Sequence, residues 1–380
     1  MSGLHSIPQM RMRARRRLPL FAFDFLDGGA GTETGLAENE AAFRRMKLTP
    51  RVLAGVETVD FGRTLFGRRY GLPFGAAPIG FSGMFWPGAE LGLARACAKA
   101  NIPYILSTAA CASVEDTMAA APETGWFQLY VGSNLEIADD LIARTEAAGA
   151  EVLVVTVDIP VPGKRLRDMV NRFTPDMKPS IPFAWQVATH PEWALATLMH
   201  GAPRFANMEK YAPPGASTQS VARSLAFQGK SLRLDWAMME RFRAKWPRKF
   251  VIKGLMHPED AAQAVKVGAD GIIVSNHGGR QLDSSPAPVE MLAPIRAAVG
   301  DRLALIVDGG IRSGEDAVKA IAAGADFVLL GRAFQFAIAA LGPDKGPEAV
   351  MAMFRDDMGR TLPLIGCASL DEVGPGNFTH

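Results

Sequence analysis

The stretch that decides the fold is ALIVDGGIRSGEDAVKAIAAGADFVLLGRAF, residues 304–334. It begins with an apolar run at 304–308 and passes through a glycine-rich turn into a segment of helical periodicity at 315–323. A second apolar run at 327–331 follows directly. Continuous apolar runs without polar alternation are typical of parallel strands that are covered on both faces. The stretch therefore predicts two consecutive strand–helix units of an α/β protein.

The same pattern recurs along most of the chain. Six further runs are predicted strands, at residues 73–78, 102–107, 126–130, 151–158, 249–254 and 271–276. Helix-like segments such as 89–100 and 258–267 lie between them. Eight units in series favour a closed (β/α)8 TIM barrel over an open sheet, which would carry a GxGxxG turn after its first strand. The turn here reads IGFSG and lacks that spacing.

Two segments do not fit the repeat. Residues 1 to about 70 precede the first strand, and we expect them to cap the bottom or the rim of the barrel. Residues 159–235 form a long insertion after the fourth strand, and an insertion of that length is a lid, a partner surface or a disordered segment. Residues 1–380 are otherwise predicted to form a single domain.

The insertion contains an apolar, tryptophan-rich stretch at 181–199. Such a stretch either lies on a membrane surface or packs against the barrel or a neighbouring subunit, and the sequence leaves both open. A basic cluster near the N-terminus is interpreted as a solvated arm in preference to a lipid contact; its members are Arg11, Arg13, Arg15, Arg16 and Arg17.

Composition narrows the class of protein. The net charge is only +2, so nothing in it favours a nucleic-acid partner. No apolar run approaches the roughly 18 residues that a bilayer span needs. The three cysteines have no metal-ligand spacing, so we expect no metal site and a reducing, cytoplasmic compartment.

Polar side chains collect where the predicted strands end. In a TIM barrel these ends meet at one mouth, where active sites lie. The mouth is predicted to contain Gly80, Ser107, Gln128, Tyr130, Thr156, Asp158, Lys253, Asn276, His277, Asp308, Gly331 and Arg332. Such a ring of ionisable groups predicts an active site.

Three features of this ring indicate chemistry. The turn at 308–314, together with Gly331 and Arg332, predicts a phosphate site, because glycines expose backbone N–H groups at helix N-termini. His277, three residues before Arg280, suits a base that acts on an anionic substrate. Lys253 suits either a counter-charge or a Schiff base, which leaves an aldolase-type lyase open.

Several motifs together resemble a known family. They are DGGAGTETGLAEN (27–39), LST (106–108), WFQLYV (126–131), TVD (156–158), SNHGGRQLD (275–283), the stretch 308–334 and IGC (365–367). Over nearly the whole chain the sequence resembles the FMN-dependent 2-hydroxy acid dehydrogenase/oxidase family. The insertion and the segment 83–96 are most similar to its membrane-associated mandelate and lactate dehydrogenases.

The resemblance implies an FMN cofactor and its contacts. Lys253 is implied to lie by flavin N1 and the C2 carbonyl, where its charge stabilises the reduced cofactor. Contacts with the rest of the flavin are implied for Pro78, Ile79, Gly80, Ser107, Gln128, Thr156 and Ser275. Contacts with the phosphate are implied for Asp308, Gly309, Gly310, Arg312, Gly331 and Arg332.

The resemblance also implies the reaction, which is oxidation of an L-2-hydroxy acid to the 2-keto acid. His277 is implied to remove a proton while hydride equivalents pass to flavin N5, and Asp158 to stabilise the resulting imidazolium. Arg165 and Arg280 are implied to bind the substrate carboxylate, with Tyr130 near the hydroxyl. Phe25 departs from the family pattern, because it stands where most relatives have a tyrosine that bonds this carboxylate.

The fate of the electrons stays open at this point. The resemblance favours a dehydrogenase that reduces a quinone or another respiratory acceptor. An oxidase that reduces O2 to H2O2 is one alternative, and an FMN-dependent isomerase or lyase on the same phosphate site is another. The resemblance further implies a homotetramer, in the cytoplasm or peripheral on the inner face of the cell membrane.

Overall fold

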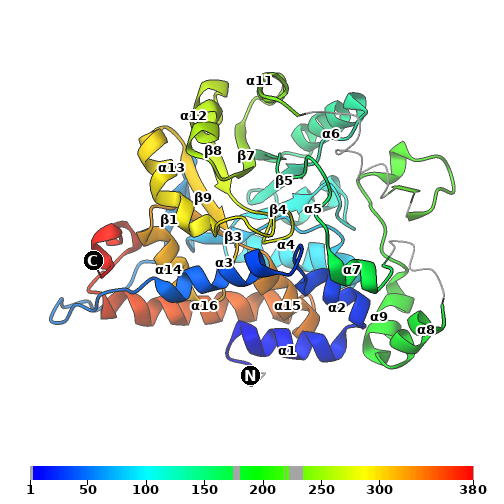
Figure 1. Cartoon of the computed structure of the whole chain (residues 1–380), viewed down its shortest axis with the longest axis horizontal. Coiled ribbons are helices and arrows are strands. Elements are labelled where there is room, and N and C mark those ends of the chain that lie inside the picture. The colour runs from blue at the N-terminus through cyan, green and yellow to red at the C-terminus, as the bar shows by residue number, and fades with distance from the viewer. Residues whose placement is uncertain (1–2, 174–179, 219, 222–233, 380) are drawn as a thin grey trace.

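Eight parallel strands form a closed barrel in the computed structural model, which describes residues 3–173, 180–218, 220–221 and 234–379 (Figure 1). Around the barrel they are β3 (Phe74–Ala76), β4 (Tyr104–Ser107), β5 (Gly125–Leu129), β6 (Val152–Thr156), β7 (Lys249–Leu255), β8 (Gly271–Val274), β9 (Ala304–Asp308) and β10 (Phe327–Leu330). The last strand closes the ring, pairing Leu330 with Ala76 of the first. The predicted TIM barrel is confirmed.

Each strand is buried on both faces, as its uninterrupted apolar run predicts. Alternate residues of a strand point to opposite faces. In β6, Val152 and Val154 lie in the core inside the barrel, whereas Leu153 and Val155 lie in the layer beneath the helices. Because both layers exclude water, neither face of the strand tolerates the polar alternation of a one-sided sheet.

A helix follows each strand on the outside of the barrel. These helices are α4 (Ala89–Lys99), α5 (Val114–Ala120), α6 (Leu135–Ala147), α11 (Trp236–Lys245), α12 (Pro258–Val267), α13 (Leu292–Val299), α14 (Gly314–Ala322) and α15 (Arg332–Leu341). Side-chain caps start several of them, as when Ser313 accepts a hydrogen bond from the N–H of Asp316 at α14. The last long helix is α16 (Lys345–Leu364), which packs along α14 and α15.

Short 3-10 helices occupy the connections. They are η1 (Ser82–Met84), η2 (Glu209–Tyr211), η4 (Pro288–Met291), η5 (Gly300–Arg302), η6 (Leu370–Glu372) and η7 (Pro375–Asn377).

The N-terminal segment covers both ends of the barrel. A hairpin of β1 (Arg63–Leu65) and β2 (Arg68–Tyr70) closes the bottom, where Phe66 packs on Trp126 and Tyr70 packs on Phe327. At the other end α2 (Leu20–Asp27) and α3 (Thr34–Arg45) border the mouth. The predicted capping role is therefore divided between these two parts.

The basic cluster does not form a solvated arm. Its arginines belong to α1 (Ile7–Arg17), which runs along α15 (Figure 1) and buries Ile7, Met10 and Ala14. The sequence interpretation overlooked this apolar face, whose spacing of three and four residues is that of an amphipathic helix. Arg13, Arg15 and Arg16 are exposed on the opposite side.

Between β6 and α11 the chain forms α7 (Leu166–Val170), α8 (Ile181–Ala188) and α9 (Pro191–His200). Residues 174–179, 219 and 222–233 of the predicted insertion lie outside the described residues. The pair α8 and α9 is attached to the barrel through Trp193, whose indole N–H donates to the carbonyl of Met84 at 2.9 Å. None of the helices in the described part of the chain has the length and hydrophobicity that crossing a bilayer demands.

Candidate active site

A cavity of about 560 Å³ opens at the carboxyl ends of the strands. This is the end of a TIM barrel at which ligands bind, and the volume lies within the usual range of ligand sites. Fifteen of the residues predicted from the sequence line it: Phe25, Pro78, Ile79, Gly80, Tyr130, Arg165, Lys253, His277, Arg280, Asp308, Gly309, Gly310, Arg312, Gly331 and Arg332.

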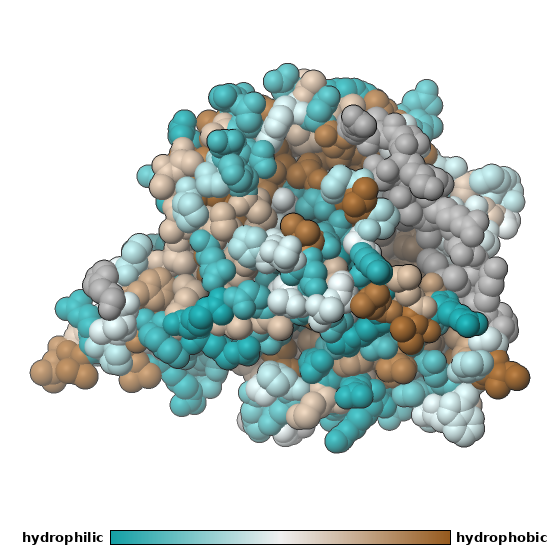
Figure 2. Space-filling view, in the orientation of Figure 1, coloured by the Kyte–Doolittle hydropathy of each residue, from teal (hydrophilic) through white to brown (hydrophobic). Residues whose placement is uncertain are grey.

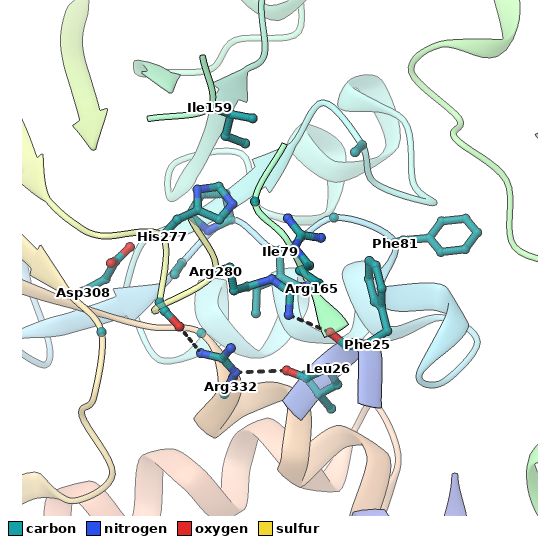
Figure 3. Close-up of a pocket in the computed structure, with 18 of the residues that line it drawn as sticks. Phe25, Leu26, Ile79, Phe81, Ile159, Arg165, His277, Arg280, Asp308 and Arg332 are labelled. Atoms are coloured by element: carbon teal, nitrogen blue, oxygen red, sulfur yellow. Dashed lines mark hydrogen bonds between the residues drawn. The ribbon is translucent and has the colours of Figure 1, made fainter. Parts of the chain in front are cut away.

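His277 projects into this cavity from the loop after β8 (Figure 3). Its Nδ1 lies 3.0 Å from Oδ1 of Asp158, and its Nε2 lies 3.5 Å from the hydroxyl of Tyr130. One ring nitrogen therefore faces a carboxylate and the other faces the cavity. With a proton on Nδ1 held by Asp158, Nε2 is free to accept a proton.

Asp158 supplies a negative charge behind the histidine. Burial alone would raise the pKa of Asp158, but the attraction of His277 and of Lys253 outweighs burial and lowers it. A close approach to Gly254 makes this placement possible, because a Cβ atom there would lie 2.5 Å from that of Asp158. Gly254 has a φ of +105°, so the position suits glycine on two counts.

Tyr130 lies beside the free face of His277. Burial raises the pKa of its hydroxyl, and the charge of Asp158 raises it further. The phenol is therefore neutral at physiological pH and can both donate and accept a hydrogen bond.

Two arginines place positive charge at the same mouth. Arg280 donates from Nη1 to the carbonyls of Phe25 and Gly28, each at 2.8 Å, and its Cζ lies 5.1 Å from the centroid of the Phe25 ring. Burial lowers the pKa of Arg280, and repulsion by Arg165 and Arg332 lowers it further. The Nε of Arg165 is buried and has no protein hydrogen-bond partner in the described structure. Partly buried positive charge of this kind favours an anionic ligand.

The predicted phosphate loop is an open backbone turn at the start of α14. Gly309 and Gly310 have φ of +100° and +83°, a region that L-residues rarely adopt. Arg312 borders the loop and pairs with Glu40 of α3 at 3.0 Å. N–H groups and a guanidinium at a helix N-terminus form a site that suits a phosphate.

Arg332 is more constrained than the sequence indicated. It lines the cavity, but its guanidinium donates to the carbonyl of Leu26 at 3.0 Å (Figure 3) and to the carbonyls of Gly28 and Gly278, each at 2.8 Å. Burial lowers the pKa of Arg332 to about 10. A guanidinium has five N–H donors, so Arg332 can join the N-terminal segment to the His277 loop and still donate to a ligand.

Lys253 forms a buried ion pair at the centre of the mouth. Its Nζ lies 2.8 Å from Oδ2 of Asp308 and 2.6 Å from Oγ of Ser275. An ammonium held this way acts as a fixed positive charge, whereas a Schiff-base lysine must present a neutral amine. The geometry therefore favours the counter-charge interpretation.

Five predicted residues do not line the cavity. Ser107, Gln128, Thr156 and Ser275 are buried, and Asp158 contacts His277. Nε2 of Gln128 and Oγ1 of Thr156 are buried, and neither has a partner within the described residues. Buried polar atoms without partners are rare in folded proteins, and they mark places where a ligand completes the hydrogen bonding.

A family model described as FMN-dependent dehydrogenase matches residues 14–380. The chain belongs to this family. It is 37% identical over 375 residues to (S)-mandelate dehydrogenase of Pseudomonas putida, covering 98% of this chain and 93% of that one.

Two further relatives are similar over the whole chain. The chain is 39% identical over 380 residues to an L-lactate dehydrogenase of Allorhizobium ampelinum, with 99% of each chain covered. A solved structure of the monotopic membrane protein (S)-mandelate dehydrogenase superposes with a TM-score of 0.94 at 36% identity, over 99% of each chain.

Members of this family are FMN flavoproteins, and the mouth of this barrel fits that cofactor. The loop at Gly309 and Gly310 suits the phosphate, while the unpartnered atoms of Gln128 and Thr156 suit the polar edge of the flavin ring. Lys253 adds positive charge near them. A cavity that combines these features with apolar walls can hold an amphipathic, phosphorylated ring system.

Sequence reasoning missed much of the apolar wall. Phe81, Phe85, Met169, Phe173 and Phe205 line the cavity, as does Asp168. Phe85 lies within the turn after the first strand, but Phe173 and Phe205 come from the long connection between β6 and α11, where no local pattern marks them. Phe205 stacks on Phe81 with centroids 4.6 Å apart. Their common location depends on how that connection folds back over the mouth.

Proposed function

We propose that this chain oxidises an L-2-hydroxy acid to the 2-keto acid, with His277 as the base. The observation that carries the proposal is the position of Nε2 of His277, which faces a cavity bordered by Tyr130 and two partly buried arginines, Arg165 and Arg280. FMN, when bound, supplies the N5 atom that accepts the hydride equivalents. The substrate loses its C–H and O–H bonds and gains a C=O bond, and one of the two hydrogens leaves as a proton to Nε2.

The other residues of the mouth bind the substrate, stabilise the protonated His277 and hold the cofactor. Arg165 and Arg280 bind the substrate carboxylate, because a guanidinium matches a carboxylate in two-point fashion. Tyr130 orients the substrate hydroxyl. Asp158 stabilises the imidazolium that forms when His277 takes the proton. Gln128, Thr156, Ser275 and Lys253 hold the flavin ring, and Gly309, Gly310, Arg312 and Arg332 hold its phosphate.

The side chain of the substrate is proposed to be aromatic, as in mandelate, in preference to the methyl group of lactate. Phe25 contacts Phe85 and Phe173, and the Phe81–Phe205 stack borders the same cavity. Aromatic walls bind a ring through edge and face contacts worth roughly 0.5–1.5 kcal/mol per pair beyond burial. A methyl group would leave much of this surface without a partner.

Anaerobic mixing with substrate tests the reaction. The purified flavoprotein is mixed with (S)-mandelate, L-lactate or glycolate, and loss of the flavin absorbance is followed. We expect rapid bleaching with (S)-mandelate and slower bleaching with L-lactate. His277→Ala should retain FMN and fail to bleach with either acid. Bleaching by His277→Ala at the wild-type rate would exclude His277 as the base.

The acceptor is proposed to be a quinone or another respiratory carrier. Mixing the reduced enzyme with oxygen distinguishes this from the oxidase alternative, because an oxidase is reoxidised within its turnover time and releases H2O2. Turnover of a 2-hydroxy acid without net consumption of any acceptor would instead identify the FMN-dependent isomerase or lyase.

We further propose that the chain contacts a membrane surface through α8 and α9. Ile181, Trp185, Leu195, Leu198 and Met199 expose between 59% and 88% of their surface. Hydrophobic side chains lie at the lower right of Figure 2, where Figure 1 places α8 and α9. An amphipathic helix pair of this kind lies in the interface and does not cross it. The related mandelate dehydrogenase is a monotopic membrane protein, which supports the proposal.

Vesicle sedimentation tests the membrane contact. Leu198→Glu should reduce binding to anionic lipid vesicles. Leu53→Glu is the matched control, because Leu53 is fully exposed in a different part of the chain. Equal binding by both variants would exclude α9 as the contact. The location is thus proposed to be the inner face of the cell membrane.

The chain is also proposed to form a homotetramer. Sedimentation velocity in detergent tests this oligomeric state.

A further inference from the structure

Two buried amides join the N-terminal helix α3 to the His277 loop. Nδ2 of Asn39 donates to Oδ1 of Asn276 at 2.9 Å, and Nδ2 of Asn276 donates to Oδ1 of Asn39 at 2.7 Å. The two residues are 237 positions apart in the chain, and they expose only 1% and 5% of their surface. Buried amides paired in both directions fix each other's orientation, because each donor has one matching acceptor.

Asn276 in turn holds the turn that presents the base. Its Oδ1 accepts a hydrogen bond from the N–H of Gly279 at 3.0 Å, and its Nδ2 also donates to the carbonyl of Pro286 at 3.2 Å. The residues from 277 to 279 are all left-handed, with φ of 58°, 66° and 72°. A non-glycine residue adopts a left-handed conformation only at an energetic cost, because its Cβ atom approaches the following carbonyl oxygen. His277 therefore depends on its surroundings to stay in this conformation.

The same turn of α3 also touches the phosphate loop. A Cβ atom on Gly310 would lie 1.9 Å from the carbonyl oxygen of Asn39, so the two backbones are in direct contact. A Cβ atom on Gly309 would lie 3.3 Å from Nδ2 of Asn39. The next residue, Glu40, pairs with Arg312 at the edge of the loop. Asn39 thus contacts the base loop through its side chain and the phosphate loop through both its backbone and its side chain.

We propose that Asn39 is a positioning residue that fixes the conformation of His277 and sets its place relative to the phosphate loop. The inference rests on the proposed role of His277 for its catalytic consequence, but its effect on FMN binding does not depend on the substrate. A displacement of about 1 Å between a base and its reaction partner can reduce the rate about 10²-fold. A joint between the two loops prevents such a displacement.

Substitutions at Asn39 separate positioning from packing. Asn39→Asp is nearly isosteric but lacks the N–H donor, and Asn39→Ala removes both bonds. Asn101→Ala is the control, because Asn101 also makes two side-chain hydrogen bonds, to Arg68 and Arg69 at the bottom of the barrel. Each variant is purified as the flavoprotein, and the thermal unfolding midpoint, the FMN dissociation constant, kcat and KM are measured.

Both Asn39 variants should show an FMN dissociation constant raised roughly tenfold, the size of one lost buried hydrogen bond. Their kcat should fall about 10²-fold, with KM within about twofold of wild type because the arginines still bind the carboxylate. Asn101→Ala should lower the unfolding midpoint without changing either quantity. The double variant Asn39→Ala/Asn276→Ala should lose less kcat than the product of the two single losses, because the two residues share one interaction.

A wild-type FMN dissociation constant and kcat in Asn39→Asp would overturn the proposal, as would equal losses in Asn101→Ala. If Asn39→Ala does not fold, Asn39→Asp carries the comparison. If no 2-hydroxy acid is oxidised by the wild-type enzyme, the proposed function fails. The FMN dissociation constant and a crystal structure of Asn39→Asp, with the φ of residue 277 as the readout, would still test the joint.

Discussion

Nδ1 of His277 lies 3.0 Å from Oδ1 of Asp158, and the other nitrogen of the ring faces the cavity. This contact decides which nitrogen of the proposed base would take up the proton. A carboxylate accepts hydrogen bonds but cannot donate one, so the proton shared between the two groups belongs to Nδ1. Nε2 is then left with a lone pair directed toward the cavity.

Asp158→Asn should lower kcat by about 10² to 10⁴-fold, the usual contribution of a positioned general base. The amide can donate to Nδ1, which would move the ring proton to Nε2 and remove the lone pair from the cavity. Steady-state kinetics with (S)-mandelate measures the effect, and the FMN content should equal that of wild type. A loss smaller than about tenfold would argue against a role for Asp158 in catalysis.

Phe25→Tyr should lower KM for the 2-hydroxy acid. The ring of Phe25 lies against Arg280, so a hydroxyl on it reaches the region proposed for the substrate carboxylate. A hydrogen bond to a charged group contributes about 1.5–3 kcal/mol, which sets a limit of roughly tenfold to a hundredfold. The dissociation constant of a non-reactive 2-hydroxy acid analogue is the cleaner measurement. An unchanged constant would mean that the new hydroxyl does not contact the carboxylate.

Lys253→Met should destabilise the apoprotein by about 3–5 kcal/mol, because it leaves Asp308 as a buried charge without its partner. Lys253 and Asp308 expose only 4% and 7% of their surface. Adding Asp308→Asn should restore most of this loss, since it removes the charge. The control is Lys249→Met on the same strand, whose half-exposed pair with Asp270 is expected to contribute at most about 1 kcal/mol. Urea unfolding of the wild type, Lys253→Met, Lys253→Met with Asp308→Asn, and Lys249→Met provides the comparison. Similar losses of unfolding free energy in Lys249→Met and Lys253→Met would contradict the prediction.

Asp27→Asn should destabilise the protein at neutral pH and have a smaller effect in acid. Burial raises the pKa of Asp27, but hydrogen bonds from Arg11 and Arg167 outweigh burial and hold the pKa below the ordinary 3.8. A carboxyl whose pKa is lowered by folding contributes its full stabilisation at pH values above the pKa that it has in the unfolded chain. This stability is lost as the pH falls through the lowered folded-state pKa. The difference in unfolding free energy between wild type and variant, measured at neutral pH and at about pH 3, should therefore shrink. A difference that is constant with pH would exclude an ionised Asp27.

Local patterns were sufficient for the barrel. Each strand is an apolar run because both of its faces are buried, and this property is visible in a few consecutive residues. The helix predicted at 258–267 matches α12 for the same reason, since its periodicity and flanking proline and glycine are local. The location of the strand-end residues at one mouth could be predicted from the barrel alone, because the carboxyl ends of its parallel strands must meet there.

The prediction of a solvated arm for the basic N-terminal segment was wrong. Arginines dominate its composition and suggested a solvated arm, yet Ile7, Met10 and Ala14 bury one face of α1 against α15. Five arginines within residues 11–17 conceal a narrow apolar stripe on the same helix. Only the packing of α15 against that stripe shows that it is buried.

From the sequence alone, therefore, come the barrel, the mouth with His277 at it, and the glycine-rich phosphate loop. Each of these depends on neighbours within one strand–helix unit. The tertiary structure decided the contacts around the His277 loop and the mouth: Asn276 is paired with Asn39, Arg332 is bound to the carbonyls of Leu26 and Gly28, and Phe205 completes the apolar wall. These contacts join segments separated by up to 306 residues, and hydrophobic periodicity states which face of a segment is buried but not which distant segment covers it.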